Sequence, residues 1–238
     1  MSKIRKIKIL GINFYDAKYN EIKCSLDKGG LLILPSGPGI STINKDKKYY
    51  KALKNSDIAL FDSGYFCLLL RILKGIKVKK FSGFKFFKAL IKSLKNEKKK
   101  ILLVETNKKQ LIINKQFLNS KNIHNTYQYV APFYKKGNIT DNNLVKKINK
   151  IKPKYIIINL GGGVQEILGS YLKNNINYKA SIICSGAAIA YFTKQQAPLN
   201  TFFDKIYLGW LIRIIFNPLI FLPRYLSALS LFIIVKNS

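Results

Sequence analysis

Short, continuous apolar runs alternate along the chain with stretches in which apolar and polar residues repeat at helical spacing. Helices are expected over 47–56, over 64–75 with Gly75 as the C-cap, and over 82–96, where lysines gather on one face. The runs expected to form buried strands are 7–14, 29–39 (a strand followed by a turn rich in Gly and Pro), 57–61, 99–105, 154–161 and 179–186. Alternation of this kind is typical of parallel strands covered on both faces. It predicts a Rossmann-like α/β fold, with a mainly parallel sheet and helices on both faces.

From Tyr207 the pattern changes to an almost unbroken apolar segment, YLGWLIRIIFNPLIFLPRYLSALSLFIIV, in which Arg213 and Arg224 carry the only charges. We therefore expect a Rossmann-like domain over residues 1–206. Residues 207–238 are expected to form a helical, membrane-proximal appendage.

The prolines Pro218 and Pro223 interrupt this appendage, whereas a membrane-spanning helix needs about 20 continuous apolar residues. The pattern favours a segment that lies on the bilayer surface. Two alternatives stay open. One is a pair of helices packed on the domain or on another subunit, and the other is a true membrane span.

The charge balance is extreme, with 42 Lys+Arg against 11 Asp+Glu and a formal net charge of +31. Such a balance favours an anionic partner, which could be nucleic acid, anionic lipid or a phosphorylated substrate. Hydrophobic residues make up 48% of the chain, which excludes a disordered polycation. A coding bias toward Lys, Asn and Ile also explains many surface lysines, so charge alone does not choose the partner. The sequence has no aromatic–basic stripe and no known nucleic-acid-binding module, and we expect no nucleic-acid partner.

Three isolated cysteines, Cys24, Cys67 and Cys184, form no CxxC pair. They suit a reducing cytosol better than a disulfide framework. His124 is the single histidine, so we expect no metal site. The N-terminus lacks the apolar region and cleavage site of a signal peptide, and we expect a location on the cytoplasmic side.

Four loops follow predicted strands and combine small residues with the start of a helix. Ligands of parallel α/β sheets bind beyond the carboxyl ends of the strands, where small residues let a ligand approach the backbone N–H groups. The sequence contains neither the GxxxxGK[ST] nor the GxGxxG phosphate-binding motif. The loops are PSGPG with Ser36 and Gly37, DSG with Asp62 and Ser63, GGGVQE with Gly161, Gln165 and Glu166, and SGAA with Gly186.

Among the acidic residues, we expect only Asp62 and Glu166 to lie at this edge of the sheet. Asp62 follows a buried strand, which makes it the better candidate for a general base. The alternative is that Asp62 caps the helix 64–75. A Ser-His-Asp triad would need His124, which lies in a polar stretch without any catalytic signature.

Several segments are similar, in order and spacing, to the motifs of one enzyme family. The turn LPSG resembles a Thr-Pro-Asn turn, SDIALFDSG an Ala-Asp…Asp-Gly segment, and KKFSGFKF a Glu-Arg-Val-x-Gly-x-Asp stretch. LGGGVQE resembles Gly-x-Pro-Lys-Gln-Glu, CSGAAIAYF resembles Gly-Val-Gly-Ala-Ala-Phe-Asp-Phe, and QQAPLN resembles Arg-Ala-Pro-x-Trp. The apolar tail YLGWLIRIIFNPLIFLPRYL is similar to Leu-Glu-Trp-Leu-x-Arg…Pro…Arg-Tyr-Leu. From about residue 7 to about residue 232 the chain thus resembles the WecG/TagA/CpsF family of bacterial glycosyltransferases.

The resemblance implies metal-independent, inverting transfer of a hexosyl or N-acetylhexosaminyl group, such as N-acetylmannosaminyl, in cell-surface polysaccharide synthesis. The donor would be a nucleotide sugar, expected to be UDP-linked, and the acceptor a polyprenyl-diphosphate-linked sugar; no cofactor is implied. The enzyme would bind an anionic membrane surface on the inner face of the plasma membrane, and a homo-oligomer stays open. Asp62 would be the catalytic base. The residues expected to bind substrate are Ser36, Gly37, Ser63, Lys80, Gly83, Gly161, Gln165, Glu166, Gly186, Arg213 and Arg224.

Within that set, Gln165 and Glu166 are expected to bind sugar or nucleoside hydroxyls, because amides and carboxylates suit groups that both donate and accept. Basic side chains at Lys80, Arg213 and Arg224 would neutralise phosphates.

Departures from the family pattern leave a second interpretation open. Ser36 stands for Asn and Lys80 for Arg, which loses bidentate geometry. A non-catalytic relative, acting as a partner in a polysaccharide-assembly complex, would tolerate such losses, although the retained Asp62 and Gln165 favour an enzyme. The other departures are Ala190 for Asp, Gln196 for Arg, Gly209 for Glu, and Leu219, Ile220 and Pro223 at positions that are often arginine.

Overall fold

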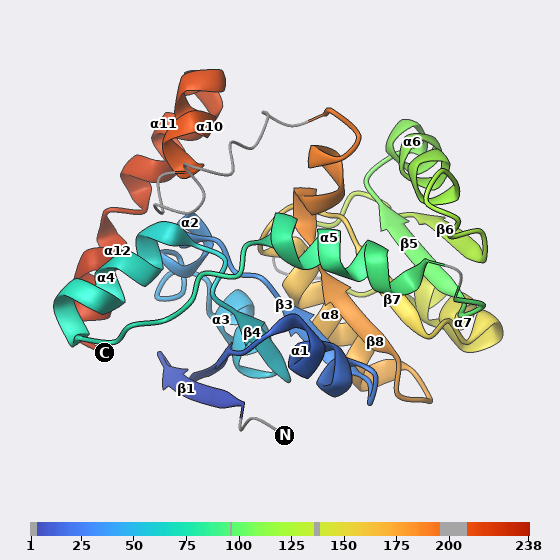
Figure 1. Cartoon of the computed structure of the whole chain (residues 1–238), viewed down its shortest axis with the longest axis horizontal. Coiled ribbons are helices and arrows are strands. Elements are labelled where there is room, and N and C mark those ends of the chain that lie inside the picture. Colours follow the sequence, from blue (N-terminus) through green and yellow to red (C-terminus); the bar gives the residue numbers. More distant parts are fainter. Residues whose placement is uncertain (1–3, 96, 136–138, 196–208) are drawn as a thin grey trace.

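An eight-stranded sheet forms the centre of the computed structural model, which describes residues 4–95, 97–135, 139–195 and 209–238. The strand order is β1-β2-β4-β3-β8-β7-β5-β6; β1 pairs antiparallel with β2, and every other pairing between described strands is parallel. This confirms the predicted mainly parallel α/β sheet (Figure 1). The strands are β1 (Arg5–Ile9), β2 (Ile12–Asp16), β3 (Gly30–Ile33), β4 (Ile58–Leu60), β5 (Ile101–Glu105), β6 (Thr126–Val130), β7 (Tyr155–Ile158) and β8 (Ser181–Cys184).

Helices cover both faces of the sheet (Figure 1). Successive strand residues point to opposite faces, so Leu31 and Ile33 join one core cluster while Leu32 joins the other. One face is covered by α3 (Lys47–Lys54), α4 (Gly64–Lys74), α7 (Asn142–Ile151), α8 (Val164–Asn175) and α12 (Ser230–Lys236). The other face is covered by α1 (Tyr19–Leu26), α5 (Gly83–Leu94), α6 (Lys108–Asn119) and the 3₁₀ helix η1 (Gly186–Tyr191).

Two strands differ from the predicted pattern. The run 7–14 is not one strand but the inner part of the β1–β2 hairpin, because Leu10 (φ 54°) and Gly11 (φ 68°) form a two-residue turn. Positive φ at both central positions matches the twist of paired strands. The edge strand β6 was not predicted, because its residues are half-exposed and lack a continuous apolar run. The predicted C-cap is confirmed: Gly75 ends α4 in the left-handed conformation (φ 64°).

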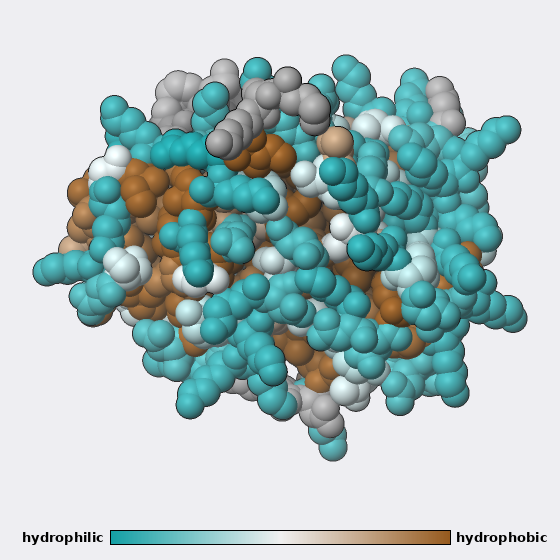
Figure 2. Space-filling view, turned by 90° about the horizontal axis from the view of Figure 1, so that it is seen from below, coloured by the Kyte–Doolittle hydropathy of each residue, from teal (hydrophilic) through white to brown (hydrophobic). Residues whose placement is uncertain are grey.

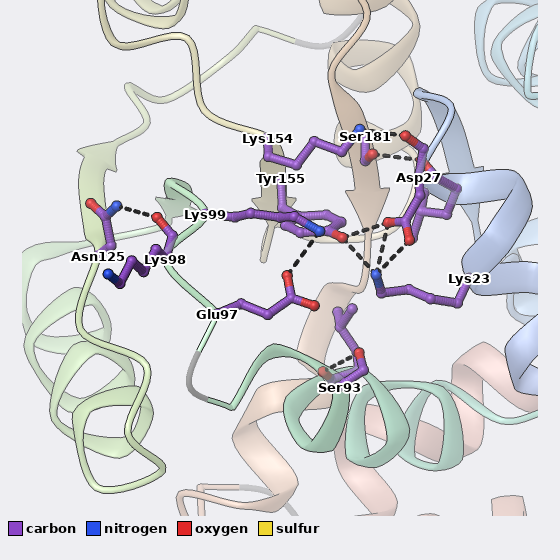
Figure 3. A network of polar contacts seen from close by, with 12 residues as sticks. Lys23, Asp27, Ser93, Glu97, Lys98, Lys99, Asn125, Lys154, Tyr155 and Ser181 are labelled. Carbon is purple, nitrogen blue, oxygen red and sulfur yellow. Dashed lines mark hydrogen bonds and ion pairs between the residues drawn. The ribbon is translucent and has the colours of Figure 1, made fainter.

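Hydrogen bonds connect α1 and the residue after it to the amino end of β7 (Figure 3). Lys23 donates from Nζ to Asp27 and to the Tyr155 hydroxyl (2.7 Å), and that hydroxyl donates in turn to Asp27. Burial, reinforced by the Asp27 carboxylate, raises the pKa of Tyr155 and keeps its hydroxyl protonated. Lys99 pairs with Glu97 at 3.2 Å nearby. These contacts lie at the edge of the sheet opposite the carboxyl ends of the parallel strands.

The C-terminal segment folds as α10 (Gly209–Phe216), α11 (Pro218–Ser227) and α12. In Figure 1, α12 lies beside α4, and Leu231 and Val235 of α12 are fully buried in the core. Other apolar side chains of α11 and α12 are exposed, and so are two on α4. The exposed residues include Leu219, Ile220, Leu222, Leu226, Leu229, Phe232 and Ile233 of the C-terminal segment and Leu68 and Ile72 of α4. Figure 2 shows a broad hydrophobic area at this end of the molecule.

The expectation that prolines leave the tail too interrupted for a span is wrong in one respect. Residues Pro218–Lys236 form one 19-residue helical stretch of mean hydropathy 1.9, enough by length and composition to cross a membrane. Pro218 does not break the stretch because it is the first helical residue, where a missing N–H costs nothing. This is weak support for a span, and the burial of Leu231 and Val235 against the domain favours packing on it.

Candidate active site

A cleft of about 690 Å³ opens at the carboxyl ends of the parallel strands. The loops after β3, β4, β5, β7 and β8 line it, and α11 borders it. The structure therefore brings together the four loops singled out in the sequence, and adds a fifth after β5. The predicted site residues that line the cleft are Ser36, Gly37, Asp62, Ser63, Lys80, Gly83, Gly161, Gln165, Glu166, Gly186 and Arg224.

Asp62 lies between β4 and α4 and is partly exposed in the cleft. The alternative that it caps α4 is wrong, because the cap is Ser63, whose Oγ accepts from the backbone N–H of Phe66 (3.2 Å). Asp62 Oδ1 instead accepts from the backbone N–H of Gly83 at 2.7 Å, at the start of α5. This bond fixes one carboxylate oxygen in place, while the residue lines the cavity in which a base would act.

The turn after β3 packs closely against the start of α4. Ser36 caps the short helix α2 (Gly37–Ile40), with its Oγ accepting from the backbone N–H of Gly39 at 3.2 Å. A Cβ at Gly37 would lie 2.7 Å from Ser63 Oγ, so a larger residue there would displace the Ser63 side chain that caps α4. The two predicted loops, one with Ser36 and one with Asp62 and Ser63, thus meet across the cleft floor.

Gln165 and Glu166 lie in the first turn of α8 and connect the glycine loop after β7 with the one after β8. Gln165 Oε1 accepts from the backbone N–H of Gly186 (2.7 Å), and its Nε2 donates to Glu166 Oε1 (3.0 Å). Glu166 Oε2 accepts from the backbone N–H of Gly163 at 2.7 Å. Glu166 is 1% exposed, and burial raises its pKa to about 7. Both side chains shape the backbone around the cleft, and their contact with substrate hydroxyls stays a prediction.

The glycines of the β7 loop have two different roles. Gly163 (φ 89°) adopts a backbone conformation that other residues rarely take. Gly161 and Gly162 do not need glycine for packing, because a Cβ at either would meet no atom within 4 Å. Open space on that side leaves their backbone accessible to a ligand in the cleft.

Glu105 was missed by sequence reasoning. We expected only Asp62 and Glu166 at this edge, and that is wrong, because Glu105, the last residue of β5, also lines the cleft. Its Oε1 accepts from Asn114 Nδ2 (2.9 Å) and Asn159 Nδ2 (2.6 Å), and burial raises its pKa to about 7. Its place at the end of a predicted strand was the signal that could have revealed it.

A second missed carboxylate is Asp46, which also lines the cleft and caps α3 by accepting from the backbone N–H of Tyr49 at 2.9 Å. The sequence pattern predicts only structural roles for these two residues, because Glu105 belongs to an apolar strand and Asp46 precedes a helix.

The C-terminal segment contributes directly to the cleft. Phe221, Arg224, Tyr225 and Ser227 of α11 line it, so the tail borders the site. Arg213 belongs to α10, and its side chain lies outside the described residues, as does Gln196.

Among the residues that the structure describes, no three His, Cys, Asp or Glu side chains gather as a potential metal site. His124 is exposed, and the three cysteines are free thiols.

A Rossmann-like sheet with a polar cleft at its strand ends, bordered by glycine loops and a fixed carboxylate, is the arrangement in which parallel α/β proteins bind their ligands. The match with known families makes this specific: residues 7–236 match the Glycosyl transferase WecG/TagA/CpsF family, and the chain belongs to that family. It is a glycosyltransferase.

A curated relative carries the same activity class. The N-acetylglucosaminyldiphosphoundecaprenol N-acetyl-beta-D-mannosaminyltransferase of Bacillus subtilis (strain 168) is 25% identical over 211 residues, which cover 79% of this chain and 77% of that protein.

Proposed function

We propose that this chain transfers a hexosyl or N-acetylhexosaminyl group from a UDP-linked sugar to a polyprenyl-diphosphate-linked sugar in cell-surface polysaccharide synthesis. The name of the Bacillus subtilis relative specifies an N-acetylmannosaminyl group and an N-acetylglucosaminyl diphosphoundecaprenol acceptor. We propose the same pair as the first candidates for donor group and acceptor. The observation that carries the proposal is the cleft itself, which joins Asp62, the glycine loops and Arg224 in one cavity.

In the proposed reaction, Asp62 removes the proton from the acceptor hydroxyl. The hydroxyl oxygen attacks the anomeric carbon of the donor sugar as the bond from that carbon to the diphosphate oxygen breaks. The electron pair of the broken bond leaves with UDP, and the configuration at the carbon inverts. Asp62 suits this role because its Oδ1 is held by Gly83 while the residue stays partly exposed in the cleft.

The leaving diphosphate gains charge, which the protein must stabilise. Backbone N–H groups of the loop with Gly161 and Gly162, together with Lys80 and Arg224, line the same cavity and supply that stabilisation in our proposal. Gln165 and Glu166 hold the β7 and β8 loops in register and contribute to binding the donor.

The C-terminal helices would bring the lipid-linked acceptor to the cleft. α11 exposes Leu219 and Leu226 outward and lines the cleft with Arg224. A helix of this kind can lie in the membrane interface with its apolar residues in lipid. The surrounding lysines would add attraction to anionic lipid, at about 1 kcal/mol for each one near the surface. We propose peripheral attachment to the inner face of the plasma membrane.

Incubation with a panel of nucleotide sugars, with and without a short-chain lipid-diphosphate N-acetylglucosamine, tests the proposal. We expect release of UDP that depends on the acceptor and is fastest with one UDP-sugar. A folded protein that binds the acceptor but releases no nucleotide from any donor would instead support a non-catalytic partner.

A further inference from the structure

A buried polar cluster at one end of the cleft is not used by the proposed chemistry. It consists of Glu105 at the end of β5, Asn114 on α6, Asn159 after β7 and Ser185 after β8. All four line the cleft, and Glu105 and Asn114 are each only 1% exposed.

The hydrogen bonds within this cluster leave some acceptor oxygens without a donor. Asn114 and Asn159 both donate to Oε1 of Glu105, and Ser185 Oγ donates to Asn159 Oδ1 at 2.7 Å. No described residue donates a hydrogen bond to Oε2 of Glu105, and the buried Oδ1 of Asn114 has no partner among the described residues. Because an unpaired buried acceptor is costly, a ligand that donates hydrogen bonds here would be bound favourably.

The place of the cluster in the sheet indicates which part of the donor it meets. Asp62 follows β4 and Glu105 ends β5, and the sheet order β4-β3-β8-β7-β5 separates these strands by four intervals. At the usual strand spacing this is about 19 Å along the edge. The glycine loops after β3, β7 and β8 lie between the two ends.

This order matches the order of groups in a nucleotide sugar. If the reacting carbon lies at Asp62 and the diphosphate over the glycine loops, the nucleoside extends toward β5. Its ribose carries two neighbouring hydroxyls, and a carboxylate beside an amide oxygen offers acceptors for both. Resting on the proposed function, we propose that Glu105 and Asn114 bind the ribose diol of the donor and select ribonucleotides over deoxyribonucleotides.

Calorimetry with UDP and 2′-deoxy-UDP on the full chain tests this inference. At pH 8, above the Glu105 pKa of about 7, wild type is expected to bind UDP at least about tenfold more tightly than 2′-deoxy-UDP, as a hydrogen bond to a charged group allows. Glu105→Gln keeps the oxygen that accepts from the two asparagines and replaces the second oxygen by an NH₂ group. In this variant we expect the preference to shrink to less than about threefold.

Two further variants make the result decisive. Asn114→Ala removes the other acceptor and should also reduce the preference, whereas Gln116→Ala, an exposed residue of the same helix, should keep it. Thermal unfolding establishes that each variant is folded.

An unchanged preference in folded Glu105→Gln overturns the inference and leaves the proposed function standing. A change in the preference for UDP over CDP, with the deoxy preference unchanged, also overturns it, because the cluster then contacts the base. A wild-type chain that binds neither UDP nor 2′-deoxy-UDP overturns both the inference and the proposed donor.

Discussion

Replacing Asp62 by asparagine isolates the function proposed for its carboxylate. Asparagine has nearly the same shape, and its Oδ1 can still accept the 2.7 Å hydrogen bond from the backbone N–H of Gly83. The substitution therefore keeps the contact that anchors the side chain to α5. It removes the negative charge and with it the ability to take a proton from the acceptor hydroxyl.

The expected loss is large in rate and small in stability. Removal of a positioned general base lowers kcat by about a hundred- to ten-thousand-fold, or about 3–5 kcal/mol in activation free energy. The affinity for UDP should stay unchanged. Asp62→Ala provides the comparison, because it leaves the Gly83 N–H without its partner, which costs about 1–3 kcal/mol for a buried group and less for this partly exposed one.

Initial rates of UDP release in the presence of acceptor, together with thermal melting, separate the two effects. Asp62→Asn should have the melting temperature of wild type and lose turnover. Asp62→Ala should lose turnover and have a lower melting temperature than wild type. Wild-type turnover in purified Asp62→Asn would refute the assignment of the base. Equal melting of the Asn and Ala variants below wild type would show that the carboxylate itself, and not the bond to Gly83, stabilises the fold.

Three further predictions follow from the cleft and the tail. Gln165→Ala should weaken UDP-sugar binding by about 1–3 kcal/mol, measured by calorimetry, and unchanged affinity would leave the loop a purely structural turn. For Glu105, the folded pKa (about 7) exceeds the ordinary value of 4.5, so the stability that its proton provides is lost as pH rises from about 4.5 through 7. The stability of wild type relative to Glu105→Gln should therefore fall by on the order of 1–3 kcal/mol over that window, and a constant difference in melting temperature would contradict the shift. The double variant Leu219→Ser, Leu229→Ser should no longer sediment with anionic vesicles at low or high salt, whereas Ile112→Ser, which changes an exposed apolar residue of α6, should sediment like wild type. Sedimentation of the double variant like wild type would exclude the tail as the anchor.

Much of the fold could be predicted because strands buried on both faces leave continuous apolar runs. β7 and β8 are buried throughout, and both lie within predicted runs. The β1–β2 hairpin and β6 escaped prediction for the opposite reason. Leu10-Gly11 is not a typical turn sequence, and the mixed residues of β6 lie half-exposed at the edge of the sheet.

The candidate site could be located from the small residues after strands, because those loops must meet at one edge. The partners of its side chains could not be predicted. Asp62 and Ser63 are both good capping residues, and only the tertiary approach of Gly83 decides which one caps the helix. The bond between Glu105 and Asn159 depends on the pairing of β5 with β7, which joins segments far apart in the sequence.

The mass of the acceptor after reaction tests the central claim most directly. Wild-type protein, a UDP-linked N-acetylhexosamine and a short-chain lipid-diphosphate N-acetylglucosamine are incubated together, and the lipid is analysed by mass spectrometry. The account predicts an acceptor heavier by one N-acetylhexosaminyl unit, formed by wild type and not by Asp62→Asn. An unmodified acceptor across the whole panel of donor sugars, with a folded protein that binds UDP, would contradict it.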